Sequence, residues 1–118
     1  MTCVIVDDNS LFLAGAADLL QREGVDVVGV ASNGADAIRL VRELQPDVTL
    51  VDIDLGDEDG FALARELNDS TASSKVILVA THAEEDLADL IDGSPALGFI
   101  AKAHLSAQAI RDTLARAA

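Results

Sequence analysis

Short apolar segments alternate with segments of helical hydrophobic spacing along the whole chain. The strand-like segments are residues 2–6, 25–31, 48–51, 76–79 and 97–101. The helix-like segments run from Ser10 to Gly24, from Asn33 to Pro46, over 61–67 and 84–91, and through a closing stretch with Ile110 and Leu114. This alternation predicts a parallel sheet with helices on both faces and right-handed crossovers. We therefore expect an α/β fold of the (βα)5 doubly wound type.

The first two predicted helices carry their own start and stop signals. Ser10 can cap the first helix, because its hydroxyl can accept from an unpaired amide, and Gly24 marks the end. Asn33 can cap the second helix, and Pro46 ends it because proline disfavours helical backbone at the preceding residue. No internal repeat, linker or low-complexity tract interrupts the 118 residues, so we expect a single domain.

The charge of the chain excludes several classes of partner. There are 8 Lys and Arg against 21 Asp and Glu, which gives a formal net charge of −13. A surface this acidic repels phosphate backbones and anionic lipid, so we expect these residues to bind neither nucleic acid nor a membrane. Cys3 is the only cysteine and forms no internal disulfide, and the N-terminus has no export signal. These features together indicate a cytoplasmic protein.

Carboxylates follow two of the predicted strands. Asp7 and Asp8 come directly after the first strand, and Asp52 closes the third. In an open parallel sheet, ligands bind outside the carboxyl ends of the strands, so these acids converge if the two strands are neighbours. Any one of them is explained equally well as a turn former or helix cap. Three together repel each other, and a hard cation such as Mg²⁺ relieves that repulsion through oxygen ligands.

Lys102 strengthens the prediction of a site. It follows the fifth strand, at the same edge of the sheet as the acids, whereas Lys75 precedes the fourth strand at the opposite edge. A lysine facing a carboxylate cluster can form a plain ion pair. It can also hold a second anion, such as a phosphoryl group on one of the carboxylates.

Three motifs occur in a fixed order along the chain. They are Asp7-Asp8, then Asp52 with Gly60 beyond it, then Gly98-Phe99-Ile100-Ala101-Lys102. In this order and spacing they resemble the receiver domain of bacterial two-component response regulators, from Thr2 to about Arg116. The resemblance implies a flavodoxin-like fold with strand order 2-1-3-4-5. It also implies one receiver domain over residues 1–118, with no output domain in this chain.

The resemblance implies a role for each residue of the cluster. Asp52 would be the phosphoacceptor, receiving a phosphoryl group from a sensor histidine kinase. Mg²⁺ would be bound by Asp52, by Asp8 directly, by Asp7 through water and by Asp54 through its backbone carbonyl. Lys102 would pair with the phosphoryl oxygens. Charge neutralisation by Mg²⁺ and Lys102 would then let an anionic nucleophile approach an anionic phosphoryl group.

The switch residues depart from the family pattern. Phe99 matches the aromatic side chain that rotates on activation, although a place in the core explains it equally well. The family usually has Ser or Thr at the position of Ala80, which has no hydroxyl. Thr81 could supply the hydroxyl after a local backbone shift, but it also fits a capping box over residues 81–84. The resemblance therefore supports phosphorylation and leaves the switch open.

Two loop positions also differ from the family. Gly56 and Ala103 stand where the family often has proline. Glycine leaves the backbone freer than proline does, so we expect the loop around Gly56 to be more flexible than in most receivers.

Two other functions compete with that of a phosphorylated receiver. Asp52-Ile53-Asp54 after an apolar strand is similar to the nucleophile motif of haloacid-dehalogenase-like phosphatases, but that family places its motif on the first strand and Gly56 breaks the pattern. The second competitor is a receiver that acts as an unphosphorylated interaction module, which the alanine at position 80 favours.

The output of such a receiver lies outside these residues. Glu84-Glu85-Asp86 and the closing Gly-Phe-Ile-Ala-Lys motif resemble receivers that precede a LuxR/NarL-type helix-turn-helix domain. The chain is then either a receiver fragment of a transcription factor, whose DNA binding belongs to the output domain, or a stand-alone regulator. A homodimer is a further expectation that the sequence leaves open.

Overall fold

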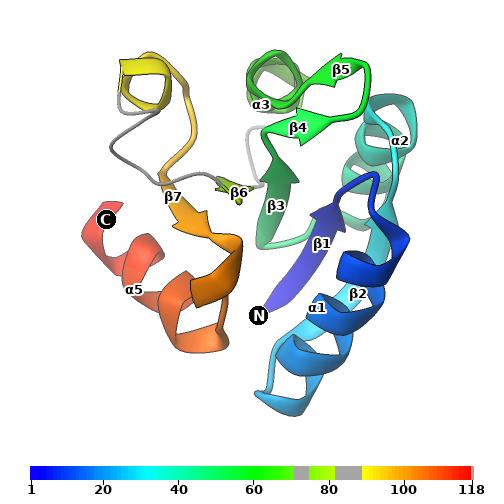
Figure 1. The fold of residues 1–118 in the computed structure, drawn as a ribbon, viewed down its shortest axis with the longest axis vertical. Helices are drawn as coiled ribbons and strands as arrows, with labels where there is room; N and C mark the ends of the chain where they lie inside the picture. Colours follow the sequence, from blue (N-terminus) through cyan, green and yellow to red (C-terminus); the bar gives the residue numbers. More distant parts are fainter. Residues whose placement is uncertain (71–74, 82–88, 118) are drawn as a thin grey trace.

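A five-stranded parallel sheet forms the centre of the protein, in the order β2-β1-β3-β6-β7 (Figure 1). The computed structural model describes residues 1–70, 75–81 and 89–117. The sheet strands are β1 (Thr2–Val6), β2 (Asp26–Ala31), β3 (Val48–Asp52), β6 (Lys75–Ala80) and β7 (Gly98–Ala101). The helices are α1 (Ser10–Arg22), α2 (Gly34–Leu44), α3 (Gly60–Ser70), α5 (Ala107–Ala117) and the 3₁₀ helix η1 (Lys102–His104), and residues 89–92 are also helical.

Counted among the sheet strands alone, this order is 2-1-3-4-5, which confirms the predicted flavodoxin-like topology. The sheet is covered on both faces: α1 and α5 lie on one side, and α2 and α3 on the other (Figure 1). Because side chains alternate along a strand, Cys3 and Ile5 pack toward α1 and α5, whereas Val4 and Val6 pack toward α2 and α3. Burial on both faces explains why the central strands are continuously apolar.

Most of the predicted boundaries hold, but the first helix cap was assigned to the wrong residue. Asn9, not Ser10, is the N-cap of α1, because the Asn9 side chain accepts from the backbone amides of Leu11 and Phe12. The second prediction is confirmed: Asn33 accepts from the Asp36 amide at the start of α2. The helix expected over 84–91 falls largely outside the described residues.

A two-stranded antiparallel ribbon, which the sequence did not predict, follows the end of β3. It pairs β4 (Asp54–Leu55) with β5 (Glu58–Asp59). Gly56 lies in its turn with φ +61°, a left-handed conformation that glycine adopts without steric cost. The Glu58 carboxylate then accepts from the Gly34 amide at the start of α2, with oxygens at 3.1 and 3.2 Å. The ribbon therefore connects the end of β3 to the neighbouring helix.

The first residue of α3 lies against the backbone at the end of β3. The Gly60 amide donates to the carbonyl of Ile53 at 2.9 Å. A Cβ at position 60 would collide with the Asp52 carbonyl oxygen and lie 2.7 Å from the Ile53 Cα. Only glycine fits here, because both obstacles are backbone atoms that cannot rotate away.

We expect Gly60→Ala to lower the free energy of unfolding by about 1–3 kcal/mol, as overpacking against rigid atoms does. Gly15→Ala is the matched control. Gly15 lies inside α1 with nothing within 4 Å of an added Cβ, so this change should stabilise the protein by about 0.5–1 kcal/mol. Urea denaturation of the two variants measures both effects. Equal changes in stability would contradict the close approach at Gly60.

Candidate functional site

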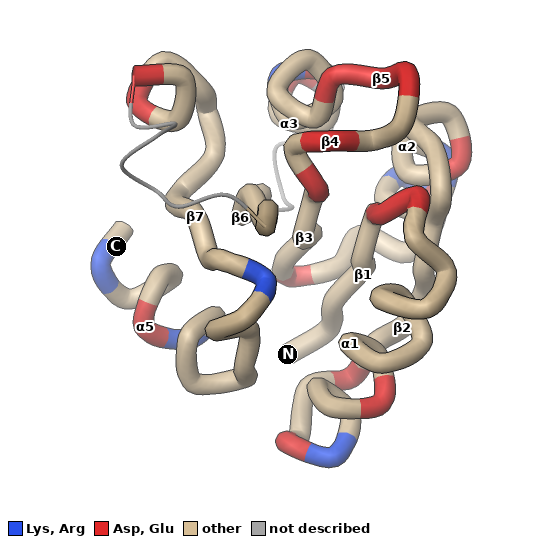
Figure 2. The backbone as a smooth tube through the Cα atoms, in the orientation of Figure 1, with Lys and Arg blue, Asp and Glu red and all other residues tan. Residues whose placement is uncertain are grey.

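Three carboxylates meet at the carboxyl edge of the sheet. One oxygen each from Asp7, Asp8 and Asp52 lies within 4.8 Å of the others. Strands β1 and β3 are hydrogen-bonded neighbours, so the residues that follow them are placed side by side. Asp7 and Asp52 are buried and Asp8 is exposed, and acidic residues continue along the β4–β5 ribbon (Figure 2). The predicted convergence of these three acids is therefore observed.

Backbone amides hold the two buried carboxylates. Asp7 Oδ1 accepts from the Asn9 amide at 2.8 Å, and Asp52 Oδ1 accepts from the Asp54 amide at 3.2 Å. Each bond uses an amide two residues further along the chain, which is the geometry that allows Asp to close a tight turn. These local turns fix one oxygen of each carboxylate and aim the other oxygen into the cluster.

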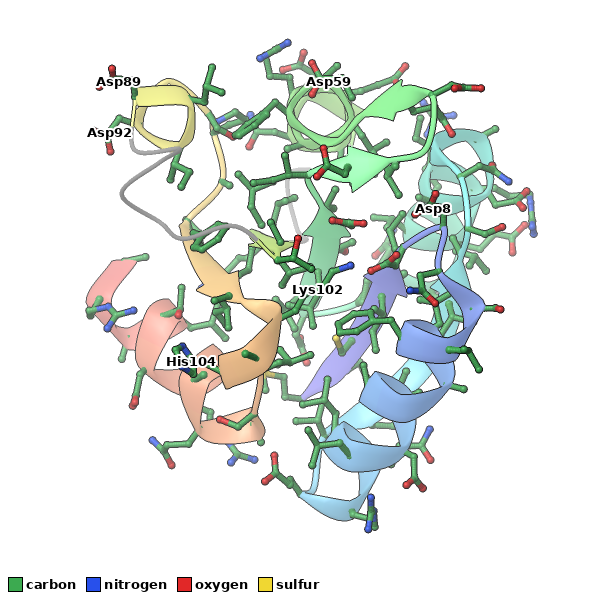
Figure 3. The ribbon with its side chains drawn as sticks, in the orientation of Figure 1. Asp8, Asp59, Asp89, Asp92, Lys102 and His104 are labelled. Atoms are coloured by element: carbon green, nitrogen blue, oxygen red, sulfur yellow. The ribbon has the colours of Figure 1, made fainter. Side chains whose placement is uncertain are left out.

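Lys102 directly follows β7 (Figure 3) and reaches the other oxygens of the same two carboxylates. Its ammonium nitrogen lies 2.6 Å from Asp7 Oδ2 and 3.4 Å from Asp52 Oδ2, and its side chain is only 15% exposed. The contact with Asp7 Oδ2 is a short ion pair, and the Asp7 side chain is fully buried. Two buried anions therefore share one cation.

The burial of these charges raises the pKa of the phosphoacceptor candidate. Desolvation raises the pKa of Asp52 to about 6, and the neighbouring charge of Asp7 adds to this effect. Lys102 and the Asp54 amide act in the opposite direction. For Lys102 itself, burial acts to lower the pKa, but its contacts with Asp7 and Asp52 outweigh burial and raise the pKa. Asp52 is therefore more basic than an exposed carboxylate and is still mostly ionised at neutral pH.

The donor set fits a hard divalent cation. The three carboxylates offer the oxygen ligands that Mg²⁺ prefers, and Lys102 alone cannot neutralise their charge. Asp7, Asp8 and Asp52 are the side chains that could hold such an ion. The Asp54 side chain is exposed, and the ligand role of its backbone carbonyl stays a prediction.

The switch candidates lie in and directly after the two sheet strands beyond β3. Ala80 is fully buried at the end of β6, and Thr81 follows it as an exposed residue. The rest of the capping box proposed for Thr81 falls outside the described residues. Phe99 is 8% exposed and belongs to the core on the α2 and α3 side of the sheet. Its ring is therefore in an inward position in this structure.

Two residues of the site were missed from the sequence. Asn9 holds Asp7 through its amide, and Phe12 places its ring 4.4 Å from the Lys102 nitrogen. Asparagine directly after Asp7-Asp8 was a detectable cap signal, but Ser10 competed with it. No signal connects Phe12 with Lys102, because its helical spacing indicates only that it belongs to the inner face of α1.

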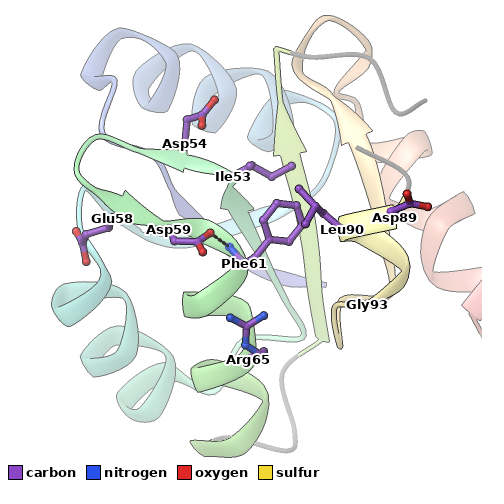
Figure 4. A pocket seen from close by; sticks show the side chains of 9 residues that line it. All are labelled: Ile53, Asp54, Glu58, Asp59, Phe61, Arg65, Asp89, Leu90 and Gly93. Atoms are coloured by element: carbon purple, nitrogen blue, oxygen red, sulfur yellow. Dashed lines mark hydrogen bonds between the residues drawn. The ribbon is translucent and has the colours of Figure 1, made fainter. Parts of the chain in front are cut away.

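A groove of about 660 Å³ lies between the first turn of α3 and the helical residues 89–92 (Figure 4). Phe61 and Leu90 form apolar parts of its wall, and Asp54 of the ribbon borders it. The Phe61 amide donates to Asp59 Oδ1 at 2.9 Å, which fixes the start of α3 at one rim. Neither Asp7, Asp8, Asp52 nor Lys102 lines this groove, so it is separate from the carboxylate cluster.

The geometry of the site agrees with a comparison against known families. A model of the response regulator receiver domain matches residues 3–115 of this chain. The chain is a receiver domain of the response-regulator family. This membership leaves the haloacid-dehalogenase-like alternative without support, because the match includes nearly every residue.

Relatives and solved structures agree with this assignment. Response regulator UvrY from Escherichia coli (strain K12) is 34% identical over 100 residues, which cover 84% of this chain and 46% of UvrY. Response regulator GacA from Pseudomonas aeruginosa is 34% identical, with 84% of this chain and 47% of GacA covered. The structure of a NarL signal receiver domain from Mycobacterium tuberculosis superimposes with a TM-score of 0.84 at 30% identity, covering 98% of this chain and 94% of that one.

The receiver domain spans about half the length of these curated relatives. Receiver domains in general bind Mg²⁺ at an acidic cluster, interact with histidine kinases and are not enzymes themselves. One relative named as an enzyme, the protein-glutamate methylesterase/protein-glutamine glutaminase 5 of Myxococcus xanthus, is 37% identical over 70% of this chain and only 24% of that protein. Within the described residues, no helix has the length and apolar character needed to cross a membrane.

The raised pKa of Asp52 makes the stability of the receiver domain depend on pH. Ionised Asp52 destabilises the folded state, because its folded pKa of about 6 exceeds the ordinary value of 3.8. This penalty is absent below about pH 4, grows through about pH 6 and is complete above it. Without Mg²⁺ at pH 7.5, Asp52→Asn should therefore raise the free energy of unfolding by about 1–3 kcal/mol.

Urea denaturation in EDTA across pH 4 to 8 measures this difference. The curves of Asp52→Asn and the parent protein should converge at the acid end. Asp57→Asn, which neutralises an exposed carboxylate in the turn of the ribbon, is the control and should leave stability nearly unchanged. A pH-independent gain for Asp52→Asn would contradict the raised pKa.

Proposed function

We propose that this receiver domain accepts a phosphoryl group on Asp52 from a sensor histidine kinase, with Mg²⁺ bound beside it. The observation that carries the proposal is the convergence of Asp7, Asp8 and Asp52 with Lys102 at one edge of the sheet. The proposed ion ligands are Asp7, Asp8, Asp52 and the backbone carbonyl of Asp54. Family membership supports the same assignment.

The proposed reaction is an in-line displacement at phosphorus. An oxygen of the Asp52 carboxylate forms a bond to phosphorus while the bond between phosphorus and the donor imidazole nitrogen breaks. The electron pair of the broken bond stays on that nitrogen. The raised pKa of Asp52 supports this role, because the carboxylate is more nucleophilic than an exposed one and is still largely deprotonated at neutral pH.

The Asp52 carboxylate and the incoming phosphoryl group are both negatively charged, so the reaction needs positive charge nearby. Bound Mg²⁺ would supply charge that neutralises the phosphoryl oxygens. The Lys102 ammonium lies 3.4 Å from Asp52 Oδ2. When a phosphoryl group is attached to Asp52, the ammonium could exchange this contact for an ion pair with a phosphoryl oxygen. Its ion pair with Asp7 at 2.6 Å keeps the ammonium in the site meanwhile. The chain would thus promote only its own phosphorylation and dephosphorylation, and would not be an enzyme.

An apolar surface beside the site suits the approach of a kinase. A hollow of about 360 Å³ lies between α1 and the segment after β7, and Lys102 forms part of its wall. Leu11 on its rim is 84% exposed. Because this hollow opens beside Lys102, we propose that the kinase segment carrying the phosphorylated histidine contacts Leu11 and the neighbouring residues there.

The proposed role of the receiver is to regulate a transcriptional output through a changed interaction surface, as a homodimer or with a partner domain. The names of UvrY and GacA as response regulators support this, and response regulators typically act in the cytoplasm, which we propose for this chain too. Buried Ala80 favours a second candidate, an interaction module that works without phosphorylation. For the first candidate, Thr81 is the proposed source of the hydroxyl that Ala80 lacks.

Phosphorylation can be measured directly by intact mass. After incubation with acetyl phosphate or phosphoramidate and Mg²⁺, the protein should gain the mass of one phosphate, and Asp52→Asn should gain none. Asp57→Asn is the matched control and should be labelled like the parent chain. A gain that survives Asp52→Asn would refute the assignment of the acceptor. No gain in the parent chain would favour the unphosphorylated module.

The acidic cluster should also couple Mg²⁺ binding to folding. Mg²⁺ at ten times its dissociation constant should stabilise the fold by roughly 1.4 kcal/mol, because it binds the folded state alone. Thermal melts with and without Mg²⁺ detect this shift. Asp8→Ala should abolish it, whereas Asp57→Ala should retain it. Superimposed melts of the parent protein would count against a metal site formed by these residues.

A further inference from the structure

We propose that Phe12 is a positioning residue, whose aromatic ring holds the Lys102 ammonium against Asp7 and Asp52. The claim concerns the reaction proposed above and therefore rests on it for its functional consequence. Its physical basis, the contact between a ring and a cation, is independent of that reaction.

The geometry is that of a cation–π contact. The Lys102 nitrogen lies 4.4 Å from the centroid of the Phe12 ring, within the distance of about 6 Å at which the negative face of a ring attracts a cation. The same nitrogen lies 2.6 Å from Asp7 Oδ2 and 3.4 Å from Asp52 Oδ2. The ring also shields the ammonium from water, and only 15% of the lysine side chain is exposed.

Four successive contacts close a circuit around this nitrogen. Asp7 Oδ1 accepts from the Asn9 amide at 2.8 Å, and Asn9 Oδ1 accepts from the Phe12 amide at 3.2 Å. The Phe12 ring contacts the Lys102 ammonium, which pairs with Asp7 Oδ2. The carboxylate that attracts the cation therefore also fixes the turn that presents the ring. No other described aromatic ring makes such a contact with a cation.

Lysine needs such a constraint more than most cations. Its ammonium is a strongly hydrated point charge at the end of a flexible stem of four carbons, and no fork geometry orients it. Asp7 and Asp52 alone attract it, but neither prevents it from turning toward solvent. The Phe12 ring against the ammonium limits that motion and keeps the positive charge where a phosphoryl group would arrive.

An ordinary packing role for Phe12 predicts different behaviour. Phe12 is half-buried and packs against the core on the α1 and α5 side of the sheet. If packing were its whole role, Leu or Met would substitute for it as far as Lys102 is concerned. A positioning role requires an aromatic ring, so Tyr should restore what Leu and Met lose.

The first experiment compares rate constants for phosphorylation by acetyl phosphate at saturating Mg²⁺. Phe12→Leu and Phe12→Met should slow the reaction by about 2- to 30-fold, the factor that corresponds to one cation–π contact, and Phe12→Tyr should stay near the parent rate. Phe61→Leu is the matched control, because it removes a buried ring that packs on the α2 and α3 side of the sheet and makes no cation–π contact with Lys102. Equal rates for Phe12→Leu, Phe12→Tyr and the parent chain would overturn the functional claim.

The second experiment observes Lys102 directly and needs no phosphorylation. The chain has two lysines, Lys75 and Lys102, so isotope labelling of lysine at the ε-carbon gives two ε-methylene signals by NMR. The ring current of Phe12 should move the Lys102 signal upfield of the exposed Lys75 signal. Phe12→Leu and Phe12→Met should abolish the shift, and Phe12→Tyr should retain it.

The two measurements distinguish failure of this inference from failure of the proposed function. A parent chain that shows the upfield signal but takes no phosphoryl group retains the Phe12 contact and refutes the proposed reaction. A parent chain that is phosphorylated but shows no ring-dependent shift refutes the Phe12 contact alone. Should Phe12→Leu fail to fold, Phe12→Met with its longer, flexible side chain decides the same question.

Discussion

Repulsion between carboxylates at the ends of β1 and β3 is the constraint on which the arrangement of the site depends. Two neighbouring parallel strands bring Asp7, Asp8 and Asp52 to the same edge, where two of the three are buried. Backbone amides satisfy one oxygen of each buried carboxylate, and Lys102 faces the other oxygens. One ammonium cannot neutralise three carboxylates, so a net negative charge remains that a divalent cation would balance.

The convergence of these carboxylates could be predicted from the sequence, because it follows from the order of the strands in the sheet. Buried parallel strands are continuous apolar runs, and residues that end neighbouring strands must meet. Local details were harder to predict. Asn9 and Ser10 are both good caps, and hydrophobic spacing does not distinguish them. The β4–β5 ribbon has strands of two residues each, too short for any period. The contact between Phe12 and Lys102 joins distant parts of the chain, and only the folded sheet brings them together.

The residues around Asp52 match the family pattern, but the residue at the end of the fourth sheet strand does not. The carboxylates and Lys102 satisfy the general pattern of a receiver, whereas Ala80 removes the hydroxyl that the family usually offers at the end of the fourth sheet strand. The proposed acceptor and its neutralising groups are thus present, whereas the usual hydroxyl is absent. Acceptance of a phosphoryl group and the response to it are therefore two separate proposals for this domain, and each needs its own measurement.

At Gly60 the backbone of α3 contacts the backbone at the end of β3 directly. A long side chain between two elements can change its rotamer and absorb a small displacement, but here the first residue of α3 touches the Asp52 carbonyl region without any side chain between them. The hydrogen bond from the Gly60 amide to Ile53 joins the same two segments. The end of β3 and the start of α3 are therefore coupled through backbone contacts alone. A displacement of the strand that carries Asp52 would reach α3 with no side chain in between to absorb it.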